Sequence, residues 1–317
     1  MKKTKILILR FSSIGDIVLT TPVVRCIKTQ WPEAEVHFVT KPAFRSLVEH
    51  NPYIDKYFLL THGLNELIRQ LKTEQYDYVV DLHHNLRTTL IKIQLGVKSF
   101  SFDKLNWQKW LLVNWHINRL PPVHIVERYL KTVEALGIQN DQQGLDYFIP
   151  PQDEVSLASL PQSHQAGYVA FAIGGQHETK KLPLSRMIDL CRHIQQPIVL
   201  LGGKEDAENG EEIKQSIDNQ HIVNACGKFN LNQSASLLRQ ATVVYTHDTG
   251  LMHIAAAFKK KIISIWGNTV PEFGMYPYRT EFVAWQVANL PCRPCSKIGY
   301  QRCPKGHFKC MNELKFE

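Results

Sequence analysis

Short hydrophobic runs alternate along the chain with segments in which apolar side chains recur every three or four residues. In the first half, strands are predicted at Lys5–Phe11, Glu35–Thr40, Lys56–Leu60 and Tyr76–Leu82. In the second half, strands are predicted at Tyr168–Ile173, Pro197–Leu201, His221–Ala225, Thr242–Thr246 and Lys261–Trp266. Most of these runs are nearly continuous in apolar residues, which is typical of parallel strands buried on both faces of a sheet.

Helical patterns fill the intervals between the predicted strands. Apolar positions repeat with helical spacing from Leu64 to Leu71, and again from Asn85 onward. A long helix is predicted over residues 123–136, with Gly137 as its stop, and Pro22 requires a helix to break or begin near Thr21. Strands that alternate with helices indicate βαβ units. We therefore expect an α/β fold of two doubly wound, Rossmann-like domains, residues 1–150 and 151–317, which face each other across a cleft.

Composition narrows the class of protein. The chain has 317 residues, of which 44% are hydrophobic and 21% charged, so it suits two folded domains and not a disordered chain. No run approaches the ~20 apolar residues of a membrane-spanning helix. The apolar part of the N-terminus is too short for a signal peptide, which favours a cytoplasmic location. The net charge of +8 favours anionic partners.

Three glycine-containing turns follow strands of the second half. They contain Gly174-Gly175, Gly202-Gly203-Lys204-Glu205 and His247-Asp248-Thr249-Gly250. Glycines let the backbone approach a ligand, and free N–H groups at a helix start bind anions such as diphosphate. Neither half contains the Gly-x-Gly-x-x-Gly dinucleotide motif, and the chain lacks a P-loop, so the turns match neither common nucleotide motif.

Polar side chains also follow two strands of the first half. Asp16 falls at a helix start, where it is either a carboxylate that favours the helix dipole or a general base. His83, Asn85 and Arg87 follow the fourth strand, where they suit either the hydroxyl groups of a substrate or an ordinary surface loop.

The motifs in combination resemble one family. The segment from Ile6 to Asp16, followed by Thr20-Thr21-Pro22, is similar to the start of glycosyltransferase family 9, the bacterial lipopolysaccharide heptosyltransferases. Asp248-Thr249-Gly250-x-x-His253 resembles the family's second signature. The resemblance implies a GT-B fold in which the first domain binds the acceptor and the second domain binds the nucleotide sugar. It also implies inverting transfer of heptose from ADP-heptose to a lipopolysaccharide core hydroxyl, with no cofactor required.

The resemblance also implies roles for individual residues. It assigns catalysis to Asp16 and places the basic residue of the family's first strand at Arg10. Arg10 is expected to bind the acceptor together with Ser13, His83, Asn85 and Arg87, which follow strands of the first half. It assigns donor binding to Lys180 (or Lys181), Glu205, Asp248, Thr249, Gly250 and His253. Gly175 and Phe229 are also expected at the donor site, although Gly175 and Gln176 stand where family members carry two threonines. Phe229 stands where a methionine is usual in the family. Two alternatives stay open: a glycosyltransferase of the same fold that uses another nucleotide sugar, and a non-catalytic nucleotide- or glycan-binding protein.

Two further segments carry their own expectations. Trp107, Trp110 and Leu111 share a helical face with basic neighbours, which suits either a membrane interface or packing against the domain core. Four C-terminal cysteines suit either a structural zinc site or reduced thiols; they are Cys292, Cys295, Cys303 and Cys310. The expected partners are a nucleotide sugar, a lipopolysaccharide core or lipid-linked glycan acceptor, and the anionic inner face of the inner membrane, with no nucleic acid.

Overall fold

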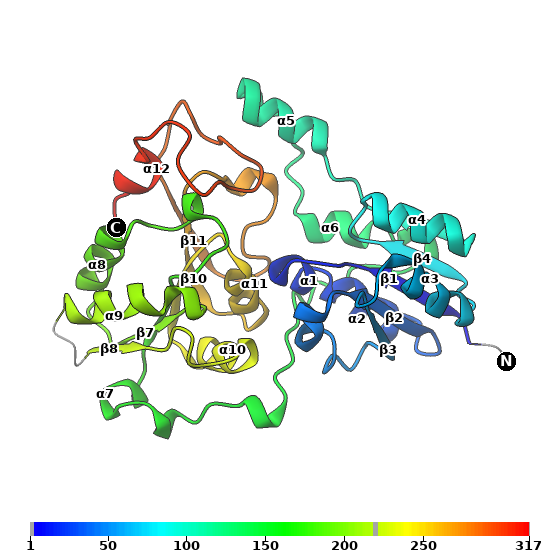
Figure 1. The fold of residues 1–317 in the computed structure, drawn as a ribbon, viewed down its shortest axis with the longest axis horizontal. Coiled ribbons are helices and arrows are strands. Elements are labelled where there is room, and N and C mark those ends of the chain that lie inside the picture. Colours follow the sequence, from blue (N-terminus) through cyan, green and yellow to red (C-terminus); the bar gives the residue numbers. More distant parts are fainter. Residues whose placement is uncertain (1–2, 218–220, 317) are drawn as a thin grey trace. The chain divides into compact units, whose positions relative to one another are not determined.

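The chain divides into two compact units in the computed structural model, which describes residues 3–217 and 221–316. Unit 1 comprises the described residues of 1–104 together with 123–148, and unit 2 comprises 105–122 and the described residues of 149–317. Residues 105–122 were predicted to belong to the first domain, but in the structure they group with unit 2. Each unit is built around one parallel sheet whose strands alternate with helices (Figure 1).

The two sheets have related strand orders. In unit 1 the strands are β1 (Lys5–Leu9), β2 (Glu35–Thr40), β3 (Lys56–Leu59), β4 (Tyr78–Asp81) and β5 (Lys98–Ser101), in the order β3-β2-β1-β4-β5. In unit 2 they are β6 (Val169–Ala172), β7 (Ile198–Leu201), β8 (Ile222–Asn224), β9 (Val243–His247), β10 (Lys261–Trp266) and β11 (Phe282–Gln286), in the order β11-β10-β9-β6-β7-β8. Each predicted strand is present, while β5 and β11 are edge strands that were not predicted.

The helices of the described residues follow the strands of each unit. Unit 1 contains α1 (Ile14–Val18), α2 (Thr21–Gln30), α3 (Leu64–Thr73), α4 (Leu86–Leu95) and α6 (Ile125–Leu130). Unit 2 contains α5 (Asn106–Trp115), α7 (Gln162–Gln165), α8 (Leu184–His193), α9 (Ala207–Gln215), α10 (Leu231–Gln240), α11 (Gly250–Ala257) and α12 (Lys309–Asn312). Pro22 lies in the first turn of α2, where its missing N–H costs nothing.

The continuous helix predicted over residues 123–136 is wrong. Helix α6 ends at Leu130, and a 3₁₀ turn, Glu134–Leu136, follows before Gly137. Thr132 Oγ1 donates to the carbonyl oxygen of Tyr129 at 2.6 Å, so its side chain competes for backbone hydrogen bonds at the break. Gly137 ends this segment with a φ of +79°, which a glycine adopts without strain.

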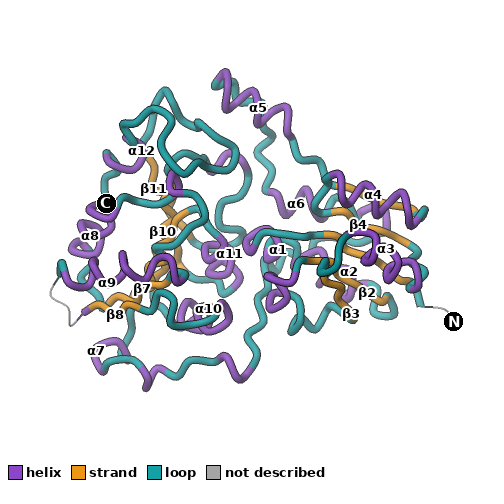
Figure 2. Tube along the Cα trace, in the orientation of Figure 1, coloured by secondary structure: helices purple, strands orange, loops and turns teal. Residues whose placement is uncertain are grey.

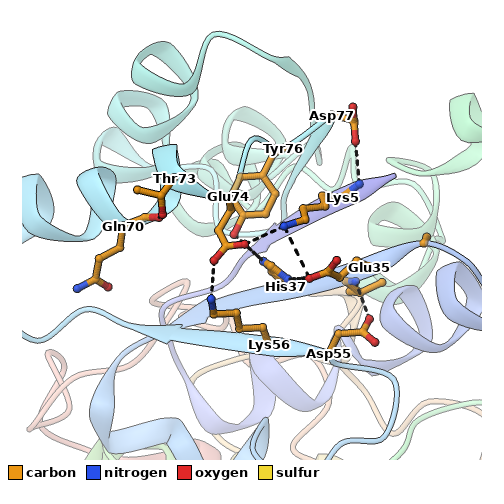
Figure 3. A network of polar contacts seen from close by, with 12 residues as sticks. Lys5, Glu35, His37, Asp55, Lys56, Gln70, Thr73, Glu74, Tyr76 and Asp77 are labelled. Carbon is orange, nitrogen blue, oxygen red and sulfur yellow. Dashed lines mark hydrogen bonds and ion pairs between the residues drawn. The ribbon is translucent and has the colours of Figure 1, made fainter. Parts of the chain in front are cut away.

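A charged network lies at the amino-terminal ends of the strands of unit 1 (Figure 3). Lys5 Nζ is 3.0 Å from the Glu74 carboxylate and 3.9 Å from that of Glu35, and Lys56 also pairs with Glu74. His37 is fully buried, and its Nε2 is 2.8 Å from Glu35. Glu35, His37 and Glu74 bring three ligand atoms within 4.8 Å of one another, but the two lysines already neutralise the carboxylates. We interpret the network as a support for this edge of the sheet.

Replacing Glu74 by glutamine should lower the thermal unfolding midpoint at neutral pH and have little effect in acid. The hydrogen bond from Lys56 holds the pKa of Glu74 below its usual value. The stability it contributes is therefore present above about pH 4.3, the ordinary glutamate value, and is lost as the pH falls through the folded-state pKa. We expect a loss of about 1 kcal/mol at pH 7. Melting curves of both proteins from pH 7 to pH 3.5 test this, and a pH-independent difference would contradict it.

Candidate active site

The first cluster of predicted site residues lies at the carboxyl ends of β1 and β4 in unit 1, the edge where parallel sheets bind ligands. Arg10 follows β1 directly and is 7% exposed. Its Nη2 lies 2.7 Å from Asp16 Oδ1, and its Nη1 donates to the hydroxyl oxygen of Tyr129 at 2.9 Å. The guanidinium group therefore fixes the position of the Asp16 carboxylate at the start of α1.

Asp16 is held ionised by its neighbours. Burial raises the pKa of this carboxyl, but the charge of Arg10 and two hydrogen bonds from Ser13 outweigh burial and hold the pKa below its usual range. The Ser13 amide donates to Oδ2 at 3.2 Å, and the Ser13 hydroxyl donates to it at 2.9 Å. Asp16 thus makes the helix-start contact expected of a capping carboxylate while its side chain stays partly accessible, at 21%. Both interpretations of this residue are compatible with the geometry.

His83 lies beside this pair as a neutral imidazole. Burial, together with the positive charges of Arg10 and Lys104, lowers its pKa to about 4. The ring packs edge-on against Phe11, with centroids 5.4 Å apart. Its Nδ1 is buried and has no hydrogen-bond partner among the residues that the structure describes. Because buried polar atoms nearly always have a partner, this nitrogen is suited to a ligand hydroxyl.

The other predicted acceptor residues are placed differently. Asn85 caps α4, since its Oδ1 accepts from the Thr88 amide at 3.0 Å. Arg87 is exposed in the first turn of the same helix. Ser13 orients Asp16, as described above, and therefore belongs to the carboxylate's support. The structure brings Arg10, Ser13 and His83 to Asp16 but leaves Asn85 in a structural role.

Sequence reasoning missed two residues of this cluster. Lys104 is half-buried; burial and the charge of Arg10 lower its pKa, while the charges of Asp81 and Asp16 act in the opposite direction. Lys104 follows β5, a strand that the hydrophobic pattern did not reveal, so no signal marked the position. Tyr129 is fully buried under Arg10, and no motif in the sequence marks it as a site residue.

The second cluster lies at the carboxyl ends of β6, β9 and β10 in unit 2. Lys180 Nζ is 2.7 Å from Asp248 Oδ2, which also accepts from the Thr269 hydroxyl at 2.8 Å. Asp248 is 8% exposed and follows β9 directly. Thr269 follows β10 and was not among the predicted site residues. The cluster places one lysine and one carboxylate beside the start of α11.

The turn after β6 approaches the start of α11 closely. A Cβ atom on Gly175 would lie 3.2 Å from the Thr249 side chain, and one on Gly174 would lie 2.5 Å from the Asp206 carboxylate. A side chain at Gly174 would therefore displace the Asp206 carboxylate, whereas one at Gly175 would need Thr249 to move only slightly. Thr249 precedes Gly250, the first residue of α11, and its buried Oγ1 has no hydrogen-bond partner within the described chain. This hydroxyl beside a helix start suits an anionic ligand.

The remaining predicted donor residues lie around this turn or apart from it. Glu205 is exposed after β7, with its carboxylate folded over Gly203. His253 is buried within α11, and Phe229 is half-buried after β8. Lys181 is buried and lies 3.7 Å from Asp206, so it is tied more deeply into unit 2 than Lys180.

The C-terminal cysteines lie elsewhere in unit 2. Cys292, Cys295 and Cys303 are on the loop that leads to α12, and Cys310 is buried within that helix. None of the four forms a disulfide.

Together, the two clusters provide complementary chemistry on separate units. Unit 1 presents an oriented carboxylate that stays ionised and can accept a proton while an oxygen atom forms a new bond. Unit 2 presents a lysine and a helix start that can stabilise a negatively charged leaving group. This division of tasks fits group transfer from an anionic donor to a hydroxyl group.

Comparison with known proteins gives consistent matches. The profile of glycosyltransferase family 9 (heptosyltransferase) matches residues 64–304. Lipooligosaccharide heptosyltransferase 2 of Haemophilus influenzae is 24% identical over 306 residues, which cover 84% of each chain. Two solved structures are similar in fold. A family 9 glycosyltransferase from Veillonella parvula has a TM-score of 0.73 at 23% identity, covering 89% of this chain and 85% of the other. The E. coli ADP-heptose lps heptosyltransferase II has a TM-score of 0.71 at 20% identity, covering 98% of each chain. The predicted GT-B fold is thereby confirmed.

Proposed function

Because the chain belongs to glycosyltransferase family 9, we propose that it transfers heptose from ADP-heptose to a hydroxyl group of a lipopolysaccharide core. The observation that carries the proposal is the match, over 84% of both chains, to a relative named as a lipooligosaccharide heptosyltransferase. The two residue clusters support it, because each has the chemistry that one partner of this reaction needs.

The acceptor would be activated on unit 1. A sugar hydroxyl has a far higher pKa than a carboxyl, so Asp16 accepts its proton only as the oxygen bonds to the anomeric carbon of the donor. Arg10 keeps the carboxylate in place throughout, through their 2.7 Å contact. A single displacement of this kind inverts the configuration at that carbon. His83, neutral and with a free ring nitrogen, is suited to orient the acceptor.

The donor would be bound on unit 2. Departure of the nucleoside diphosphate increases its negative charge, and Lys180 with the start of α11 would stabilise that charge. Lys180 pairs with Asp248 in the structure, so the same lysine would be shared between carboxylate and diphosphate. Because protein groups supply the positive charge, we propose that the transfer step itself requires no cofactor and no added magnesium.

The function is tested by measuring binding and transfer with a panel of nucleotide sugars. Calorimetry with ADP-heptose, UDP-sugars and GDP-sugars identifies the donor, and mass spectrometry of a heptose-deficient lipopolysaccharide acceptor detects the added sugar. We expect the acceptor to gain one heptose when ADP-heptose is the donor, and no sugar from the UDP-sugars or GDP-sugars. Transfer from another nucleotide sugar would favour the related-donor alternative, and binding without any transfer would favour a non-catalytic protein.

We further propose that the protein works in the cytoplasm, at the inner face of the inner membrane, through α5. The helix exposes three tryptophans: Trp107 at 64%, Trp110 at 37% and Trp115 at 61%. Trp107 and Trp110 stack with centroids 5.2 Å apart. This exposure supports the membrane interpretation of the tryptophans over packing against the core, whereas Leu111 is half-buried and Leu112 packs against Val270 and Phe273. Among the described residues, no helix is long and apolar enough to span a membrane.

Basic groups accompany this tryptophan face, defined as Trp107, Trp110 and Trp115. Lys109 lies on α5 itself, with its Nζ 6.0 Å from the ring centre of Phe273. Lys297 Nζ donates to the Asn106 carbonyl oxygen at 3.1 Å, which brings the basic C-terminal segment to the helix. Exposed tryptophans beside lysines suit the interface of an anionic bilayer.

Substituting Trp107 and Trp115 by serine should weaken binding to vesicles that contain phosphatidylglycerol by at least about tenfold, or ~1.4 kcal/mol. Vesicle co-sedimentation measures this, and neutral phosphatidylcholine vesicles should bind the wild-type protein more weakly. Val283→Ser, which removes a 44% exposed apolar side chain from β11, is the matched control and should bind normally. Equal binding by the double variant and the wild type would show that the tryptophan face is not the contact.

A further inference from the structure

The cysteine segment, defined as residues 292–310, gathers potential metal ligands at one end of unit 2. It contains four cysteines and His307, whose Nε2 lies 3.8 Å from Cys292 Sγ. Apart from α12 at its end, the segment is loop, as the trace between β11 and α12 in Figure 2 shows. Of the four thiols, only that of Cys310 is therefore held by a helix, and the other three lie on loop.

All four thiols are at least partly shielded from solvent: Cys310 is buried, and Cys292, Cys295 and Cys303 are half-buried. A divalent cation bound among them would be held by thiolates, so its binding would release the thiol protons.

The same segment is hydrogen-bonded to the loop that carries Lys180. The Thr179 amide donates to the Tyr300 carbonyl oxygen at 3.1 Å, and the Tyr300 amide donates to Thr179 Oγ1 at 2.8 Å. Gly299 packs against His177 so closely that a Cβ atom would lie 2.6 Å from its side chain. The position of Lys180 therefore depends on the conformation of residues 299–300.

A second set of contacts reaches the loop after β10. Arg293 is half-buried; its Nε donates to the Gly267 carbonyl oxygen at 2.6 Å, and its Nη2 donates to that of Thr269 at 2.8 Å. The Cys295 amide donates to the Asn268 carbonyl oxygen at 3.3 Å. Thr269 in turn donates to Asp248, the partner of Lys180. Both sides of the Lys180–Asp248 pair are thus connected to the segment between Cys292 and Cys303.

From these contacts we propose that Cys292, Cys295, Cys303 and Cys310 bind one thiophilic metal ion, Zn²⁺ or Fe²⁺, and that this ion fixes the two donor-site loops. Four thiolates favour these metals over Mg²⁺, which prefers oxygen ligands. The role is structural, because the ion would act through Tyr300 and Arg293. The effect on the donor rests on the proposed function, whereas metal binding itself does not.

Closing such a site requires the loop to contract. Tetrahedral sulfurs bonded to zinc lie ~3.8 Å apart. In the described chain, no three ligand atoms of these cysteines and His307 come within 4.8 Å of one another. A cavity of about 390 Å³ between the Lys180 loop and the segment is lined in part by Thr179, Lys181, Gln301 and Cys303. Its volume gives Cys303 room to move.

Metal content tests the site directly. Full-length protein purified under reducing conditions, without chelator, from cells supplied with zinc and iron should contain about one of these ions per chain by elemental analysis. The Cys292→Ser/Cys295→Ser double variant should lose it, while Cys191→Ala, which removes a buried cysteine outside the segment, should keep it. Wild-type protein without stoichiometric metal, or a double variant that retains the metal, would overturn the proposal.

The link to the donor site is tested by ADP binding. Stripping the wild-type ion with a strong thiol-competing chelator should weaken ADP binding about tenfold, and restoring the metal should recover it. This comparison uses unmodified protein, so it stands even where the double variant fails to fold. Equal ADP affinity with and without the metal would overturn the proposal that the ion fixes the donor-site loops. Bound metal with no ADP binding at all would instead count against ADP as the nucleotide of the proposed donor.

Discussion

An Asp16→Asn variant is expected to lose about three orders of magnitude in kcat, the range seen when a general base is removed. The asparagine keeps the size of the side chain and can still contact Ser13, but it cannot accept the proton of the acceptor hydroxyl. Its affinity for ADP should be nearly unchanged, because the donor cluster lies on unit 2. Steady-state kinetics with both substrates, together with calorimetry for ADP, separates the two effects.

The matched control for this variant is Asp55→Asn. Asp55 also forms an ion pair, with Lys28 at 2.7 Å, but it belongs to the opposite edge of the same sheet. We expect its turnover to stay at the wild-type level. If Asp16→Asn turned over as fast as this control, Asp16 would be only a helix-start residue.

A Lys180→Ala variant should bind ADP about 10- to 100-fold more weakly, the loss expected for a charge-assisted hydrogen bond. The substitution also leaves Asp248, 8% exposed, as an unpaired negative charge beside the diphosphate. That charge would disfavour the leaving group further, so kcat should fall together with affinity.

A Lys181→Ala variant tests which of the two lysines, Lys180 or Lys181, binds the donor. Lys181 pairs with Asp206 and Glu178, so its loss should affect thermal stability more than ADP binding. If Lys181→Ala lost ADP affinity and Lys180→Ala did not, the assignment of the donor lysine would be reversed.

The sequence predicted strands well wherever they were buried on both faces. β1 contributes four consecutive apolar residues, Ile6 to Leu9, that are fully buried, and this continuity is visible without a structure. β5 reads Lys-Ser-Phe-Ser and is mostly exposed at the sheet edge, so its composition carries no such signal. Because β5 was not predicted, Lys104, which follows it, was not predicted as a residue at the end of a strand.

Contacts between residues that are distant in the sequence could not be predicted, for a different reason. Motif spacing identified Arg10 and Asp16 as neighbours in sequence, but nothing in it reveals that the Tyr129 hydroxyl contacts the guanidinium group. In unit 2, the pairing of Lys180 with Asp248 joins two turns that follow different strands. Such pairs depend on strand order, which the hydrophobic pattern does not specify.

Residues 105–122 leave the ribosome long before the rest of unit 2 has been synthesised. Leu112 must therefore stay uncovered, beside three exposed tryptophans, until Val270 and Phe273 are made. Unit 1 can therefore fold during translation only while this segment, which contains α5, lacks the residues that it packs against. The nascent chain is thus most prone to self-association or chaperone capture after unit 1 has been synthesised and before Val270 and Phe273 have. In a chain truncated after residue 148, Leu112 would stay exposed permanently.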